Sequence, residues 1–346
     1  MINYTKHIIA MSIENSFLTK GYNKIHATFF GGRQNVSIIY LMPGIFIGII
    51  LGANDAASIF GPLVAVGSVR YRTASIFSAI FVILGATVGG ANGLETLNTL
   101  TVLERDQSAV ATLAAALTVI LMILIKAPAS VSQAVVGSLI GVAFLNGAET
   151  IRWDILIKIV AIWIITPLSA ILISFSLYRL VAYFFRKLKN VRVQDLVLQY
   201  ANLMALCYSA YSLGANNVAN VARSFVTGES NLVVAQLLGG VSIAIGIMFF
   251  SKRMTFVIGK SIIVLDHFSS LISGLALATN VFVFSMVGVP VSATQSAIGS
   301  VVGTGMSRGQ RLSSRKTKIK IILGLVLTPS VSGIISVLLH LILRGG

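Results

Sequence analysis

Apolar residues fill most of this chain in ten long runs, separated by short polar or charged stretches. The runs cover about residues 39–60, 74–92, 109–126, 128–146 and 153–185, and then 198–222, 232–251, 258–287, 290–306 and 319–343. An apolar run of about 20 residues can cross a bilayer as a helix, and backbone polar groups cannot be left bare in lipid. The pattern therefore predicts an all-α polytopic membrane protein. Only Pro128 and its neighbours separate the third run from the fourth, so these two are either two spans or one re-entrant hairpin.

Polar residues interrupt the apolar runs in pairs of similar stretches. Residues 51–58 (LGANDAAS) recur 162 positions later at 213–220 (LGANNVAN), and 128–133 (PASVSQ) recur at the same offset at 290–295 (PVSATQ). A Thr-Pro pair at 166–167 also returns at 328–329. Three pairs at one offset indicate that the chain is a tandem duplication.

Composition narrows the class of protein. The chain is 56% hydrophobic and 10% charged, with a mean hydropathy of +0.91, whereas soluble domains are about 25% charged. The net charge of +16 comes from basic residues between the apolar runs, so they are interpreted as cytoplasmic loop anchors rather than a nucleic-acid surface. No Walker loop, nucleophile elbow or His-Glu-x-x-His motif is present, which argues against an enzyme. The single cysteine, Cys207, and the four scattered histidines form no metal-ligand spacing.

Loop charge predicts how the two halves are oriented. Arg70 and Arg72, like the stretches 186–189 and 308–320, are basic and predicted to be cytoplasmic, while 93–106 and 147–154 are acidic or neutral and predicted to be external. Loops related by the 162-residue shift have opposite charge character. The fold class we expect is therefore two inverted-topology repeats, with broken or re-entrant helices meeting at a midplane site.

This reading divides the chain into four parts. They are an N-terminal extramembrane or interfacial arm (1–38), a first transmembrane repeat (39–185), a basic cytoplasmic linker (186–197) and a second transmembrane repeat (198–346).

Asp55 is the first candidate for chemistry. A carboxylate inside a span costs about 2.5–3.5 kcal/mol, so it faces a cavity or pairs with a neighbouring helix. Gly52 and Gly214 are predicted to break their helices, which would expose N–H groups that favour an anion. The neighbouring side chains can coordinate sodium or donate to an oxyanion, although interhelical hydrogen bonding explains Ser58 or Asn220 alone equally well. The candidate sodium ligands are Asn54, Asp55, Asn216 and Asn217.

The two Pro-x-Ser stretches supply the second group of candidates. Pro128 and Pro290 interrupt helices and leave backbone carbonyls free. Hydroxyls and amides follow them at short spacing, and the shared offset places all four motifs at one pseudo-symmetric site. These candidates are Ser130, Ser132, Gln133, Ser292, Thr294 and Gln295.

Two charged positions near these motifs have two readings each. Lys126 either adds positive charge to an anion path or extends to the membrane surface. Asp266 and His267 form either a proton or ion element or the edge of a helix, and we favour the helix edge.

Together, the paired GAND-like stretches and the Pro-x-Ser-x-(Ser/Thr)-Gln stretches resemble those of the inorganic phosphate transporter family, over about residues 40–343. The resemblance implies a secondary carrier of two inverted repeats that moves phosphate with sodium or protons across the cell membrane, without a bound cofactor. It also implies that Asn54, Asp55, Asn216 and Asn217, with the Ser, Thr and Gln residues named above, form the substrate and cation sites. Two features depart from the family pattern: Asn217 stands where Asp is usual, and Gln133 and Gln295 stand where many members have His.

The missing carboxylate bears on the choice of anion. Phosphate carries a proton near neutral pH and sulfate does not, so a carboxylate in the site accepts a hydrogen bond from phosphate and repels sulfate. Phosphate is the predicted substrate because Asp55 is retained, and a sulfate permease is the alternative. An uncoupled anion channel is a third reading. The expected partners are the anion, sodium or protons and the lipid bilayer, with a homo-oligomer left open.

Overall fold

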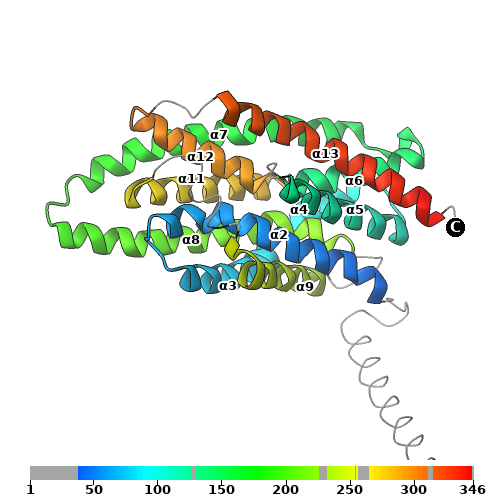
Figure 1. The fold of residues 1–346 in the computed structure, drawn as a ribbon, viewed down its shortest axis with the longest axis horizontal. Helices are drawn as coiled ribbons and strands as arrows, with labels where there is room; N and C mark the ends of the chain where they lie inside the picture. Colours follow the sequence, from blue (N-terminus) through cyan, green and yellow to red (C-terminus); the bar gives the residue numbers. More distant parts are fainter. Residues whose placement is uncertain are drawn as a thin grey trace, which may run out of the picture.

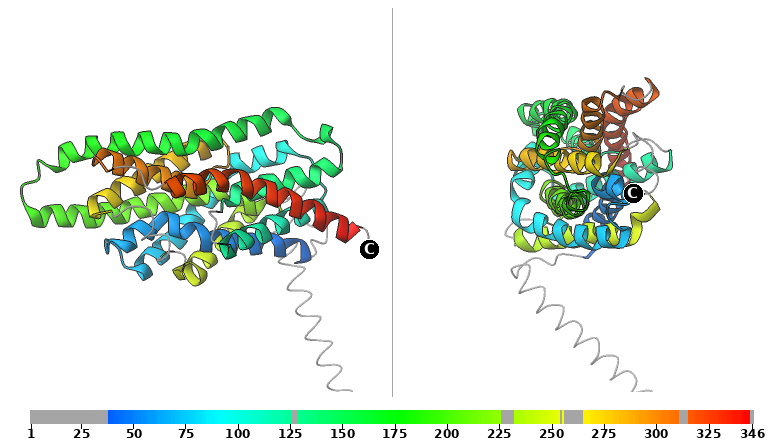
Figure 2. Two further views of the ribbon diagram at one scale, coloured as in Figure 1. Left: turned by 45° about the horizontal axis from the view of Figure 1, so that its top comes forward. Right: turned by 90° about the vertical axis from the view of Figure 1, so that its left-hand side faces the viewer.

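The computed structural model describes residues 38–125, 129–225, 232–253, 255, 265–310 and 315–344. Helices lie side by side along one long axis to form a bundle, seen from the side in Figure 1 and nearly end-on in the right-hand view of Figure 2. The predicted N-terminal arm lies outside the described residues except for Ile38, where α2 begins. Among the described residues the one β-type pairing is an isolated bridge between Thr101 and Ile151.

The helices follow the apolar runs closely. The first half contains α2 (Ile38–Ala65), α3 (Tyr71–Gly89), α4 (Ala91–Leu100), α5 (Arg105–Leu124), α6 (Val131–Leu145), the 3-10 turn η1 (Ala148–Thr150) and α7 (Trp153–Phe185). The second half contains α8 (Val191–Ala222), α9 (Leu232–Ile245), the π-helical turn η2 (Gly246–Phe250), α11 (His267–Met286), α12 (Ala293–Ser307) and α13 (Arg315–Arg344). Residues 191–197 of the predicted linker form the first two turns of α8. The helix α4 lies in a stretch that the charge pattern assigned to a loop.

Seven helices of the described part are long and apolar enough to cross a membrane: α2, α3, α5, α7, α9 with η2, α11 and α13. This agrees with the prediction of an all-α, multi-pass membrane protein. The helices α6 and α12 have 15 residues each, which is about 22 Å of helix, shorter than the roughly 30 Å hydrocarbon core.

The duplication is visible in the helix bounds. Shifting α5 and α6 by 162 positions gives the bounds of α11 and α12 residue for residue, and the first residue of α7 shifts onto the first residue of α13. The same local sequence pattern therefore starts and stops helices at equivalent places in both halves.

The two halves exchange helices. Helix α6 of the first half packs on α13 of the second, and α12 of the second packs on α7 of the first (Figure 1). Glycine permits this close packing, because a Cβ on Gly137 would lie 2.2 Å from the Pro329 carbonyl oxygen and one on Gly299 would lie 2.5 Å from that of Pro167. The Ser332 hydroxyl adds a hydrogen bond of 2.6 Å to the Ala134 carbonyl oxygen.

We call the GAND-like stretches 51–58 and 213–220 the two signatures. One expectation about their glycines is wrong. Helices α2 and α8 continue unbroken through Gly52 and Gly214. Both glycines serve packing instead, because a Cβ on Gly52 would lie 2.0 Å from the Ile243 carbonyl oxygen, and one on Gly214 would lie 2.1 Å from that of Val82. Each signature helix thus rests backbone to backbone on a helix of the other half.

The two ends of the bundle differ in charge. We call one the basic end, where the α2–α3 turn meets α11 through a 2.6 Å hydrogen bond between Ser68 and His267, and where Arg308 pairs with Asp266 at 3.2 Å. The connection 186–190 lies at this end, because Phe185 contacts Phe268. We call the other the acidic end, where α4 ends and α5 and α7 begin. The backbone N–H of Arg152, just before α7, donates there to the carbonyl oxygen of Leu100, the last residue of α4. The carboxylates of the acidic end are Glu95, Glu104, Asp106, Glu149 and Asp154.

Candidate functional site

Each Pro-x-Ser stretch leads into a short helix in the same way. The Ser130 hydroxyl caps α6 by accepting a hydrogen bond from the backbone N–H of Gln133 at 3.4 Å. The Ser292 hydroxyl caps α12 by accepting one from the backbone N–H of Gln295 at 3.2 Å. Each motif thus supplies the residue at which its short helix begins. The N-terminal end of a helix carries partial positive charge from its unpaired N–H groups.

Asn216 holds the segment before α12 against α8. Its side-chain amide donates to the Val291 carbonyl oxygen at 2.9 Å, while its side-chain oxygen accepts from the Val291 amide at 3.1 Å. The Trp163 indole donates to the neighbouring Pro290 carbonyl oxygen at 3.2 Å, which ties the same segment to α7. Because both polar atoms of the Asn216 side chain bind this backbone, Asn216 fixes the motif in place in this conformation.

Ser132 lies at the centre of a second cluster. Its hydroxyl donates to Asn217 Oδ1 at 3.2 Å or to the Val291 carbonyl oxygen at 3.1 Å, and it accepts from Asn220 Nδ2 at 3.0 Å. Asn220 also donates to Asn217 Oδ1 at 3.0 Å. All these side chains are buried. The structure therefore brings together the signature of α8, the motif of α6 and the motif before α12.

The signature of α2 is arranged differently. Asn54 Nδ2 donates to Asp55 Oδ1 at 2.7 Å, and both side chains are buried, with Asp55 3% exposed. Among the described residues no hydrogen bond joins this pair to the Ser132 cluster. One turn further along α2, the Ser58 hydroxyl reaches Thr294 of α12 at 3.5 Å, which brings α2 to the second Pro-x-Ser motif.

Several buried amide atoms in these motifs have no hydrogen-bond partner among the described residues. They are Gln133 Nε2 and Oε1, Asn217 Nδ2, Asn220 Oδ1 and Gln295 Oε1. An unpaired buried polar group costs about 1–3 kcal/mol, and here such groups gather on the residues that the sequence singled out. The arrangement can supply both donors and acceptors to a small polar ligand. No group of three His, Cys, Asp or Glu side chains suited to a metal occurs in the described part of the chain.

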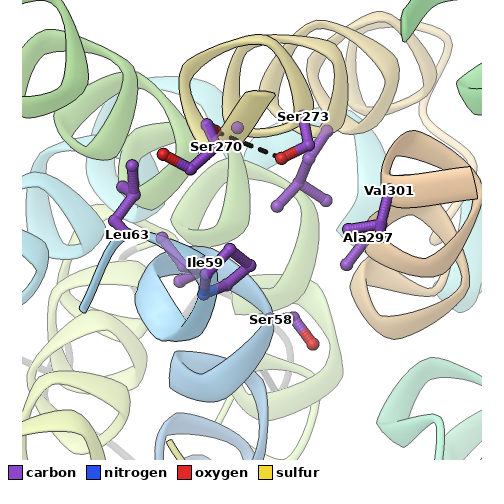
Figure 3. Close-up of a pocket in the computed structure, with 10 residues that line it drawn as sticks. Ser58, Ile59, Leu63, Ser270, Ser273, Ala297 and Val301 are labelled. Atoms are coloured by element: carbon purple, nitrogen blue, oxygen red, sulfur yellow. Dashed lines mark hydrogen bonds between the residues drawn. The ribbon is translucent and has the colours of Figure 1, made fainter. Parts of the chain in front are cut away.

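A cavity lies between the Ser58–Thr294 contact and the basic end (Figure 3). It is small, with about 10 Å³ of room for water, and lies between α2, α11 and α12. Ser58, Ser270 and Ser273 line it among apolar residues, and the Ser273 hydroxyl donates to the Ser270 carbonyl oxygen at 3.1 Å. Beyond Ser270, Asp266 caps α11 and pairs with Arg308, as expected for a helix edge.

Comparison with known proteins identifies the family. A model of the phosphate transporter family matches residues 51–336, which is most of the chain. The chain belongs to the phosphate transporter family. The family match spans both signatures and both Pro-x-Ser motifs, in agreement with the resemblance seen in the sequence.

Relatives of this family member carry two kinds of name. A protein of Methanocaldococcus jannaschii, named as a candidate phosphate permease, is 26% identical over 84% of this chain and 92% of its own. A sulfate permease of Bacillus subtilis is 29% identical over 76% of this chain and 75% of its own. A solved structure, "The sodium-dependent phosphate transporter", superposes with a TM-score of 0.81 at 22% identity, covering 89% of this chain and 98% of that one, which shows a shared fold.

One residue of this transporter-family site was not foreseen. This residue is Arg223, which is buried one turn beyond Asn220. The sequence could have indicated it, because the equivalent position in the first half is the uncharged Gly61. Lys126 and Pro128 were singled out, but both lie outside the described residues.

Proposed function

We propose that this protein is a secondary active transporter that moves inorganic phosphate across the cell membrane together with sodium or protons. The observation that carries the proposal is the buried Ser132–Asn217–Asn220 cluster with its unpartnered amides, which joins both halves inside a membrane-spanning bundle. A polar cluster of this kind is expensive in lipid and typical of a transported substrate's path. Family membership and the phosphate permeases among its relatives support the same substrate.

In this proposal the phosphate oxygens bind the amides of Gln133, Asn217 and Gln295 and the N-terminal ends of α6 and α12. Neutral donors suit an anion in a low-dielectric setting, because they compensate charge without the strong desolvation cost of a lysine. The co-transported cation binds at Asp55, which supplies the one carboxylate of the signatures, with Asn54 and Asn217 as further oxygen ligands. Asn216 belongs to this set only if it releases Val291.

Two inverted-topology repeats then operate by alternating access around a midplane site. The opposite courses of the signature helices support this arrangement: α2 ends at the basic end, beside Ser68, whereas α8 ends at the acidic end, beside Leu97. By the positive-inside rule the basic end is cytoplasmic and the acidic end external. Helices α6 and α12 are the moving elements, and each moves together with the helix of the other half on which it packs, α13 for α6 and α7 for α12.

Sulfate is the second candidate substrate, and one observation favours it. Asn217 takes the position that corresponds to Asp55, so the second signature lacks the carboxylate that would repel a fully ionised anion. A relative that covers most of this chain is a sulfate permease.

Uptake into proteoliposomes tests the proposal. Radiolabelled phosphate is supplied with an imposed sodium gradient or an imposed proton gradient, with and without excess unlabelled sulfate. Gradient-driven uptake that ignores sulfate is the expected result and names the coupling ion. Suppression by sulfate would assign the protein to sulfate, and flux that ignores both gradients would indicate a channel.

A further inference from the structure

Arg223 is a buried cation at the acidic end of α8. Its side chain is 6% exposed, and Arg223 and Asp55 are the only buried Arg, Lys, Asp or Glu residues in the part of the chain that the structure describes. Burying a charge in an apolar bundle is costly unless the charge is compensated, and in membrane proteins such residues are usually functional.

The compensation of Arg223 comes from neutral groups. Its Nη1 donates to the Leu97 carbonyl oxygen, and its Nη2 donates to the Thr101 carbonyl oxygen at 2.9 Å and the Thr101 hydroxyl at 3.2 Å. These acceptors lie in the last turn of α4 and just after it, where the helix dipole is negative. Nε has no partner among the described residues. The guanidinium therefore connects α8 to α4 through Nη1 and Nη2, while Nε remains unused.

The repeat shows that this charge belongs to the second half alone. The position equivalent to Arg223 is Gly61, and the position equivalent to Asn217 is Asp55. Over one and a half turns, the second signature has lost a negative charge and gained a positive one. The acidic end of α8 is thereby electropositive relative to the matching part of α2, which faces the cavity at the basic end.

Arg223 also lies close to the proposed substrate site. Asn220, three residues earlier and therefore on the same side of α8, donates to Ser132 at 3.0 Å. Arg223 lies on the acidic side of Asn220 along α8, and it holds the contact between α8 and α4 at that end.

We propose that Arg223 is the residue that recognises the oxyanion on its way in from the external side. When α4 and α8 separate, the guanidinium exchanges Leu97 and Thr101 for two oxygens of the anion, which its planar fork fits in bidentate fashion. The anion thereby replaces the acceptors that opening removes, so external opening is favoured when substrate is present. This inference rests on the proposed function only in taking the substrate to be a tetrahedral oxyanion.

Two substitutions distinguish recognition of the anion from a purely structural role of Arg223, because they should change the external KM in opposite directions. Arg223→Gln removes the charged fork and raises the external KM about tenfold, the loss expected for a charge-assisted hydrogen bond. Thr101→Val keeps the side-chain shape but removes one acceptor, so the externally open state becomes more populated. The external KM then falls about two- to threefold, since apparent affinity follows the fraction of the competent state.

The experiment measures KM from both sides in proteoliposomes of known orientation, with inorganic phosphate and then sulfate as the probe. Arg192→Gln, which removes the same charge from an exposed position at the other end of α8, is the matched control and leaves both KM values unchanged. The internal KM stays within about twofold of wild type in the Arg223 and Thr101 variants, because the internal route does not pass Arg223.

The inference is overturned if both variants lower the maximal rate and leave KM unchanged. That result would mean that Arg223 only stabilises the packing of α8 against α4. If Arg223→Gln fails to insert, Thr101→Val alone decides, and an unchanged or raised external KM rejects the inference. Arg223→Lys, which keeps the charge but not the fork, gives an intermediate external KM. Wild-type protein that carries neither anion would instead reject the proposed function itself.

Discussion

Ser58 of α2 and Thr294 of α12 are joined by their hydroxyls at 3.5 Å. The equivalent pair in the other half, Asn220 and Ser132, is joined at 3.0 Å. The Asn220–Ser132 pair also bonds to Asn217 and to the backbone of Val291, whereas Ser58 lines the small cavity between α2, α11 and α12. The repeat thus makes the same contact twice, tightly on the acidic side and loosely on the basic side.

Asp55→Asn tests the cation site. We expect gradient-driven uptake to fall at least about 100-fold, because the variant removes the one carboxylate of the two signatures and with it the charge that holds the cation. Surface expression should be unchanged, since Asn preserves the shape of the side chain. Uptake is measured in proteoliposomes under each gradient. Normal uptake by the variant would remove Asp55 from the site.

Asn217→Asp tests the origin of anion selectivity. Restoring the carboxylate that the first signature carries should weaken competition by sulfate about tenfold or more relative to phosphate, because a carboxylate accepts a hydrogen bond from protonated phosphate and repels sulfate. The measurement compares inhibition constants of the two anions. Asn220→Asp, one turn away, is the control for charge alone. Equal changes for both anions would refute the role of position 217.

Gly52→Ala and Gly214→Ala test backbone packing. Each added Cβ would lie about 2 Å from a carbonyl oxygen of the facing helix, so we expect a loss of about 1–3 kcal/mol in stability, seen as a lower melting temperature in detergent. The control is Gly274→Ala, where the nearest atom, Ala205 Cβ, is 3.8 Å away. A Gly274→Ala variant as unstable as the other two would contradict this packing account.

Cysteine labelling tests which side of the transporter is open. In a Cys207→Ser background, Ser273→Cys places a thiol at the cavity, and Ala111→Cys places one at the repeat-equivalent position of α5. In the orientation proposed above, the cavity side is cytoplasmic. A membrane-impermeant thiol reagent should therefore label Ser273→Cys from the cytoplasmic side faster than it labels Ala111→Cys from outside. Ser273, although only 3% exposed, lines the cavity, whereas Ala111 is 0% exposed. Equal rates would show that the two sides are equally open.

The sequence predicted the elements of this fold better than their partners. Apolar runs and Pro-x-Ser stretches located the helices, because span length and helix-breaking residues act locally. The offset of 162 identified equivalent positions, but equivalence says nothing about contact, so the packing of α6 on α13 and of α12 on α7 was not foreseen. Gly52 was taken for a helix break because its packing partner, Ile243, lies on a helix of the other half.

The candidate site shows the same division. Asn217, Asn220 and Ser132 were singled out by type and spacing, and the structure places them within hydrogen-bond distance of one another. Arg223 was missed because an arginine at the end of an apolar run resembles an ordinary membrane anchor. Only burial and the contacts to Leu97 and Thr101 distinguish it from one.

The exchange of α6 and α12 between the halves has a consequence for how the chain is made. Helix α6 leaves the ribosome long before α13, the helix that its glycines are shaped to meet. After insertion, the small and hydroxyl-bearing residues of α6 that contact α13 therefore remain without this partner until almost the entire chain has been synthesised. Neither half can mature alone, and a truncation within α13 would leave the earlier half unfinished as well.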